Sequence, residues 1–109
     1  MILKGKSANG GFTFGKAIKL VNIDYNELSK TNFDGKILIV KNLTPDLIVF
    51  INKISGIISE NGGITSHAAI IAIEFNIPCV VGVKDCMSKI NNDDYIRLDA
   101  NEGIVDVHK

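Results

Sequence analysis

The sequence predicts a single domain of mixed α and β structure within its 109 residues. Short runs of β-branched residues recur along the chain, and helix-start signals fall between some of them. Strand-like segments outnumber helical segments and the two types alternate, which is typical of a mixed α/β domain. No repeat or low-complexity stretch interrupts the pattern, so we take residues 1–109 as one domain.

The first strand is expected over residues 12–20, directly after the glycine pair Gly10 and Gly11. Apolar and small or polar residues alternate along this segment, which favours a half-buried strand, although Lys16 breaks the alternation. A second strand is expected over residues 36–40, because the sequence KILIV is short, apolar and β-branched.

A helix should follow over residues 44–53. Thr44 is a suitable N-cap, Pro45 suits the first helical position, and Asp46 carries negative charge into the first turn. Residues 56–59, with the sequence GIIS, are expected to form the next strand.

A tight loop at Gly62 and Gly63 should lead into a second helix over residues 66–75. This helix is apolar nearly all round, which predicts burial on more than one side. Asn76 is expected to end it with a positive φ, because a proline follows two residues later. A further strand is expected over residues 79–83.

The last two strands should form a terminal hairpin over residues 95–99 and 104–107, with a turn at residues 101–103.

Composition excludes several classes of function. Twelve Lys and Arg balance twelve Asp and Glu, without a basic stripe, so no nucleic-acid partner and no anionic membrane partner is expected. The longest apolar run, residues 68–73, is far shorter than the roughly 20 residues of a membrane helix, and we expect a cytoplasmic protein. Cys79 and Cys86 match no metal or redox motif, so we expect buried, reduced thiols and no metal site.

The chemically informative residue is His67, which stands at the start of the helix predicted over residues 66–75. Unpaired N–H groups and a partial positive charge at a helix N-terminus favour a bound phosphate. The same field disfavours a protonated imidazole, so His67 should stay neutral and able to attack a phosphoryl group. Thr65 and Ser66 would donate hydrogen bonds to the phosphate, and Gly62 and Gly63 would leave room for the donor. From these residues alone, a simple helix cap with an inert histidine remains an equal alternative.

A longer set of residues carries a resemblance to a known family: Gly62, Gly63, Thr65, Ser66, His67, Ala68, Ala69, Ala72, Glu74, Ile77, Pro78, Val80, Val81 and Gly82. In this order they resemble the swivelling phosphohistidine domain of phosphoenolpyruvate synthase, pyruvate phosphate dikinase, phosphotransferase-system enzyme I and rifampicin phosphotransferase. The resemblance extends to residues 11–17, 44–46 and 99–107, and so spans nearly the whole chain.

The resemblance implies a swivelling β/β/α phosphohistidine domain in which His67 accepts a phosphoryl group and passes it on. It implies that Gly62, Gly63, Thr65 and Ser66 support the phosphate. It also implies two partners acting in trans, an ATP-binding domain and a domain for phosphoenolpyruvate, pyruvate or another acceptor. Mg²⁺ and ATP or phosphoenolpyruvate are then expected on those partners, with no cofactor bound by this domain. The chain would be a component of a phosphotransferase and not a complete enzyme.

Two positions depart from the family pattern. Asn76 replaces a glycine, which is a mild change because Asn tolerates the left-handed conformation. Ile73 replaces an arginine and so removes a charge, which bears on docking or phosphate delivery more than on the nucleophile. Ile73 motivates one alternative, a non-catalytic regulatory or binding module that retains the fold. A purely structural or oligomerising domain is a further alternative.

Overall fold

The computed structural model describes residues 1–21, 26, 30–42, 53–62 and 67–109, and for residues 67 and 68 it describes the backbone alone. The helix expected over residues 44–53 therefore lies almost wholly outside the described residues. The elements of the described part are β1 (Ile2–Lys4), β2 (Lys6–Asn9), β3 (Phe12–Leu20), β4 (Ile37–Val40), β5 (Gly56–Ser59), α3 (His67–Phe75), β6 (Cys79–Val81), α4 (Cys86–Lys89), β7 (Tyr95–Asp99) and β8 (Ile104–His108).

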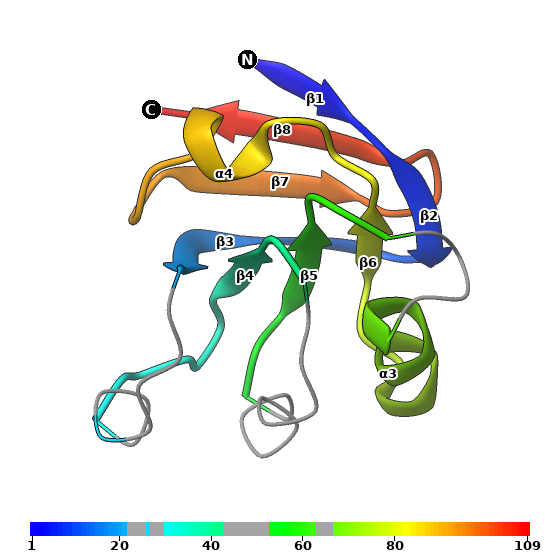
Figure 1. Ribbon diagram of the computed structural model, residues 1–109, viewed down its shortest axis with the longest axis horizontal. Helices are drawn as coiled ribbons and strands as arrows, with labels where there is room; N and C mark the ends of the chain where they lie inside the picture. Colours follow the sequence, from blue (N-terminus) through cyan, green and yellow to red (C-terminus); the bar gives the residue numbers. More distant parts are fainter. Residues whose placement is uncertain (22–25, 27–29, 43–52, 63–66) are drawn as a thin grey trace.

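The strands form a mixed sheet in the order β1-β8-β7-β3-β4-β5-β6-β2. Strands β3, β4, β5 and β6 run parallel, and the remaining pairs are antiparallel. Figure 1 shows that the β1-β8-β7 part lies over the parallel strands, with α3 on the other side. Strand β3 belongs to both parts, because its first half pairs with β7 and its second half pairs with β4.

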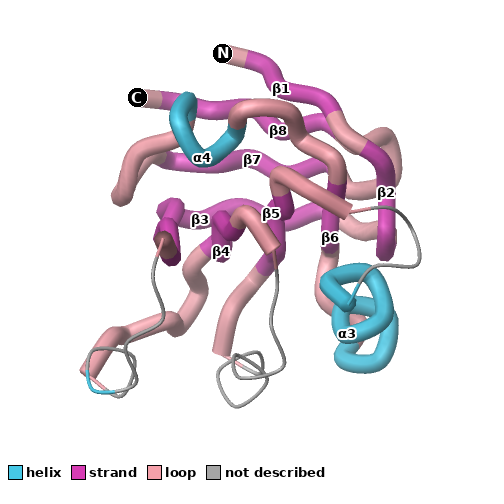
Figure 2. The backbone as a smooth tube through the Cα atoms, viewed as in Figure 1, coloured by secondary structure: helices cyan, strands magenta, loops and turns pink. Residues whose placement is uncertain are grey.

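Side chains of β4 point alternately to opposite faces of the sheet, and this explains why the fold has two cores. Ile37 and Ile39 pack into a core between the two β layers, whereas Leu38 and Val40 pack into a second core on the α3 side. Both faces of the strand are thus buried, which is why its sequence is a continuous apolar run. The described part is a three-layer β/β/α arrangement, and the prediction of a mixed α/β fold is confirmed (Figure 2).

Most predicted strands are confirmed, including those at residues 12–20, 56–59 and 95–99. The strand expected over residues 79–83 is shorter, because β6 ends at Val81. Gly82 follows with a φ of 67°, and this left-handed conformation interrupts the extended backbone.

Strands β1 and β2 were not predicted from the sequence. They are only three and four residues long, and their sequences, ILK and KSAN, lack the alternating signal of a half-buried strand. Only Gly5 separates them, although β1 pairs with β8 and β2 pairs with β6 at opposite ends of the sheet order. The N–H of Gly5 donates to the carbonyl oxygen of Gly103 at 2.9 Å, which fastens this crossing to the β7–β8 turn.

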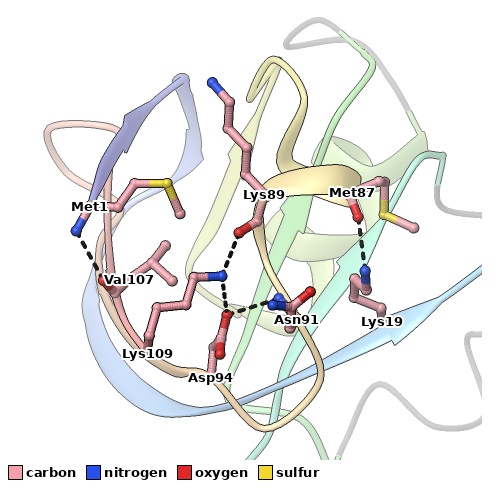
Figure 3. A network of polar contacts seen from close by, with 8 residues as sticks. All are labelled: Met1, Lys19, Met87, Lys89, Asn91, Asp94, Val107 and Lys109. Atoms are coloured by element: carbon pink, nitrogen blue, oxygen red, sulfur yellow. Dashed lines mark hydrogen bonds and ion pairs between the residues drawn. The ribbon is translucent and has the colours of Figure 1, made fainter.

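The two ends of the chain lie side by side on the β8 side of the molecule (Figure 3). The amino group of Met1 donates to the carbonyl oxygen of Val107 at 3.1 Å. The ammonium group of Lys109 donates to the carbonyl oxygen of Lys89 at 2.8 Å and to the Asp94 carboxylate at 2.9 Å. These contacts join β1, β8 and the end of α4.

Helix α4 was also missed by the sequence analysis, because four residues are too few for a helical hydrophobic period. Cys86 and Ile90 pack into the core between the β layers. The ammonium group of Lys19 donates to the carbonyl oxygen of Met87 at 2.9 Å, and Glu60 accepts the N–H of Met87 at 3.3 Å. Side chains from β3 and from the end of β5 thus hold this short helix in place.

Candidate functional site

The candidate site begins where the chain leaves β5. Ser59 is a buried polar residue, and its hydroxyl donates to the carbonyl oxygen of Asn61 at 2.6 Å. The N–H of Asn61 donates to the carbonyl oxygen of Lys41 at 3.0 Å, which ties this turn to the end of β4. The backbone that approaches Gly62 is therefore held on both sides.

Gly62 adopts a φ of 110°, a conformation that residues with a side chain rarely adopt. A Cβ atom on Gly82 would lie 3.6 Å from the carbonyl oxygen of Gly62, so the segments after β5 and β6 run in close contact. This geometry confirms a constrained glycine at Gly62. Gly63, Thr65 and Ser66, which the sequence predicts as phosphate-supporting residues, lie outside the described residues.

His67 is the first residue of α3. The prediction that it lies in the first turn of a helix is confirmed at the level of the backbone. Nine residues give α3 a macrodipole with partial positive charge at its first turn, where an anion is favoured. The expected exposure of the imidazole ring stays a prediction.

The far end of α3 matches the sequence prediction. Asn76 has a φ of 54°, in the left-handed region. The N–H of Ile77 donates to the carbonyl oxygen of Ala72 at 2.9 Å, and the N–H of Asn76 donates to that of Ile73 at 3.2 Å. These two bonds form a Schellman motif, which satisfies carbonyl groups that the helix leaves unpaired.

Asn9, at the end of β2, adds a second cap that the sequence analysis missed. Its side-chain amide donates to the carbonyl oxygen of Ile77 at 3.0 Å and lies 3.4 Å from that of Ala72. An asparagine in a polar N-terminal segment gives no signal of this role, because its partner lies more than sixty residues away.

The expectation that α3 is buried on more than one side is wrong. Ala69, Ile71 and Ala72 are buried against the sheet. Ile70 is 52% exposed and Ile73 is 56% exposed, so one face of the helix presents hydrocarbon to solvent. Nine residues cover a single edge of the sheet near β2, β5 and β6, where no described element packs on the outer face of α3.

The other titratable groups lie apart from this helix start. His108 is on β8, and its Nε2 atom lies 3.0 Å from the Asp106 carboxylate. Burial raises the pKa of both Cys79 and Cys86 to about 12, so both thiols are protonated at neutral pH. Within the described residues, no three His, Cys, Asp or Glu side chains come together in a way that could hold a metal ion.

Among the helices of the described residues, none is long and apolar enough to cross a membrane.

Comparison with known proteins identifies the family. Residues 32–103 match the family model of the PEP-utilising enzyme mobile domain. The probable phosphoenolpyruvate synthase of Pyrococcus horikoshii is 37% identical over 105 residues, which cover 96% of this chain and 12% of that protein. The chain thus spans about an eighth of the length of this curated relative.

Solved structures agree with the architecture. A solution structure of Enzyme I matches 68% of this chain and 31% of its own, with a TM-score of 0.61 and 36% identity. Aconitase X of Thermococcus kodakaraensis matches 100% of this chain and 99% of its own with a TM-score of 0.74, but its 24% identity establishes the fold alone. On the family match, which covers most of its length, the chain belongs to the mobile domains of PEP-utilising enzymes.

Proposed function

We propose that this domain is a phosphoryl carrier in which His67 accepts a phosphoryl group from one partner and passes it to another. One observation carries the proposal: in a chain of the PEP-utilising mobile-domain family, the candidate nucleophile is the first residue of helix α3. A helix start is a place where a phosphorylated side chain is stabilised without a metal ion.

The proposed reaction has two balanced steps. A lone pair on the neutral imidazole attacks phosphorus, an N–P bond forms, and the P–O bond to the donor's leaving oxygen breaks. The imidazole proton is released, which leaves a neutral ring that carries the phosphoryl group. In the second step an acceptor oxygen attacks phosphorus, the N–P bond breaks, and the freed imidazole nitrogen takes up a proton, which restores the neutral ring.

The residues before His67 would support the phosphorylated state. We propose that N–H groups of the first turn and the hydroxyls of Thr65 and Ser66 donate to the phosphoryl oxygens. The positive φ of Gly62 supports a role for the glycine pair Gly62 and Gly63 in bringing the backbone close to the phosphate.

The partners would be an ATP-binding domain and a domain for phosphoenolpyruvate, pyruvate or another acceptor, in the same polypeptide or in trans. We propose that Mg²⁺ and ATP or phosphoenolpyruvate are bound there, and that the carrier swivels between the two sites. The relatives support this, because their chains are about eight times longer than the segment they share with this protein.

The test is to incubate the protein with a related phosphoenolpyruvate synthase that lacks its own mobile domain, together with ATP and Mg²⁺. Intact-mass measurement should detect one added phosphoryl group that is lost in acid, as expected of a phosphoramidate. His67→Ala should abolish the modification. His108→Ala is the matched control and should leave it unchanged, since the chain has only these two histidines. If the donor phosphorylates its own mobile domain, supplied as a separate protein, but never this chain, the regulatory or binding module replaces the carrier.

A further inference from the structure

The outer face of the β1-β8-β7-β3 layer is left uncovered by the described elements. Phe12 and Phe14 on β3 are 72% and 66% exposed, and Tyr95 on β7 is 41% exposed. Three exposed aromatic rings on neighbouring strands are unusual, because burial of such rings is strongly favourable. This face lies on the far side of the molecule from α3 (Figure 1).

A shallow depression of about 390 Å³ lies on this face, lined by Phe14, Tyr95, Arg97 and His108. The strand register brings the four together, because Phe14 lies directly opposite Arg97 and Tyr95 lies directly opposite His108. The volume is near the lower end of the roughly 300–1,000 Å³ that is usual for small-molecule sites.

The acidic groups of the face are already engaged. Asp106 contacts the imidazole of His108 at 3.0 Å, and one carboxylate oxygen of Asp99 accepts the N–H groups of Asn101 and Glu102. The guanidinium of Arg97, in contrast, is exposed and makes no hydrogen bond or ion pair with any described residue. Of the four residues that line the depression, Arg97 alone carries a permanent charge, which is positive, and Asp106 on β8 lies directly opposite it in the strand register.

The two aromatic rings restrict how a planar ligand can fit. Their centroids are 6.1 Å apart and their planes are tilted by 35°. A base held between them would need two contacts of about 3.5 Å each between parallel planes, so there is no room for one. A planar group would instead lie against the open face of Phe14, beside the guanidinium of Arg97.

We propose that this depression binds a nucleoside phosphate, with the base against the open face of Phe14 and the phosphate at Arg97. A guanidinium binds a phosphate through two parallel hydrogen bonds, and an aromatic ring stacks on any base. The site is independent of His67, so a nucleotide bound there leaves α3 accessible to partner domains.

Binding is tested by titration of the whole chain with AMP, followed by NMR chemical shifts and calorimetry. Adenosine and inorganic phosphate are the two comparison ligands. AMP should bind saturably, and each comparison ligand should bind at least roughly tenfold more weakly, because it makes only one of the two contacts. If inorganic phosphate binds as tightly as AMP, the depression is a simple anion site. If adenosine binds as tightly as AMP, Arg97 does not contribute to binding. Either result overturns the proposal, as does no saturable binding at millimolar AMP.

Variants locate the site. Phe14→Leu and Arg97→Gln should each weaken AMP binding by roughly tenfold or more. Phe12→Leu is the matched control, because this ring is equally exposed on the same strand but does not line the depression. His67→Ala should bind AMP as the natural chain does. Phe12, Phe14 and Arg97 are exposed, so urea unfolding should confirm that their variants have unchanged stability. Retention of full affinity in both Phe14→Leu and Arg97→Gln would place the nucleotide elsewhere and overturn the proposal.

Discussion

The side-chain amide of Asn9 donates a 3.0 Å hydrogen bond to the carbonyl oxygen of Ile77, and so fastens the second strand of the chain to the end of helix α3. The bond reinforces the Schellman motif around Asn76. Helix α3 is therefore held at the end opposite His67.

Replacing Asn9 with Ala should lower the free energy of unfolding by about 1–2 kcal/mol, because the carbonyl oxygen of Ile77, just after α3, loses its side-chain donor. Urea unfolding measures this, and hydrogen exchange should show the loss concentrated in α3. Asn42→Ala is the control, since Asn42 is exposed and makes no such bond to described residues. Equal effects of the two substitutions would show that the Asn9 cap contributes nothing.

A comparison of Gly103 and Gly35 distinguishes the energetic cost of left-handed backbone from the cost of steric overlap. Gly103 and Gly35 have nearly the same φ, 70° and 69°. A Cβ on Gly103 would overlap the carbonyl oxygen of Gly5, whereas a Cβ on Gly35 meets nothing within 4 Å. Gly35→Ala should therefore cost about 1–2 kcal/mol for the left-handed conformation alone. Gly103→Ala should cost clearly more in the same unfolding experiment, and similar values would show that the β1–β2 crossing shifts freely.

The two faces of α3 should respond differently to charge. Ile73→Arg should change the free energy of unfolding by no more than about 0.5 kcal/mol, because Ile73 is more than half exposed. Ile71→Arg, two residues away, should destabilise by about 3 kcal/mol or more, because Ile71 is only 6% exposed. Thermal and urea unfolding measure both, and a large loss with Ile73→Arg would contradict the exposed face.

The buried thiols make stability depend on alkaline pH. Burial raises the pKa of Cys79 and Cys86 from 9.0 to about 12, so the folded chain keeps protons that the unfolded chain releases. Their contribution to stability is complete below pH 9 and is lost as the pH rises toward 12. Between these two pH values, the free energy of unfolding should fall by about 1.4 kcal/mol per pH unit for each thiol.

Measurement of urea unfolding from pH 8 to 10.5 tests this, with a Cys79→Ala, Cys86→Ala double variant as the reference. The natural chain should lose stability more steeply than the variant. The thiols should also resist alkylation at pH 8 until the chain is unfolded. Identical pH profiles for the two proteins would argue against the raised pKa values.

The phosphoryl carrier proposal makes a graded prediction about Ser66. Ser66→Ala should slow phosphorylation of His67 by a partner, but by less than about tenfold, because backbone N–H donors of the helix start remain. Mass spectrometry of samples quenched at successive times gives the rate of phosphorylation. The chain alone with ATP or phosphoenolpyruvate should stay unmodified, since its sequence has no nucleotide-binding loop. Complete loss of His67 phosphorylation in Ser66→Ala would show that the Ser66 hydroxyl has a larger role than we propose.

Local sequence was sufficient to predict those elements whose signals are local. The alternating or continuous apolar runs of β3, β4, β5 and β7 predict strands because burial of one or both faces requires them. Asn76, followed closely by Pro78, predicts the end of α3 because left-handed geometry favours few residue types. The sequence also predicted that His67 lies at the start of this helix, and the backbone of α3 confirms that position.

Tertiary structure alone decided the features that join distant parts of the chain. Strands β1 and β2 are strands because β8 and β6 provide partners for their backbone groups, a condition that their own short sequences do not encode. The exposed face of α3 likewise follows from what packs beside it: Ile70 and Ile73 are as apolar as Ile71, yet only Ile71 meets the sheet. Hydrophobic character is a property of a residue, whereas burial depends on the neighbours that the fold supplies.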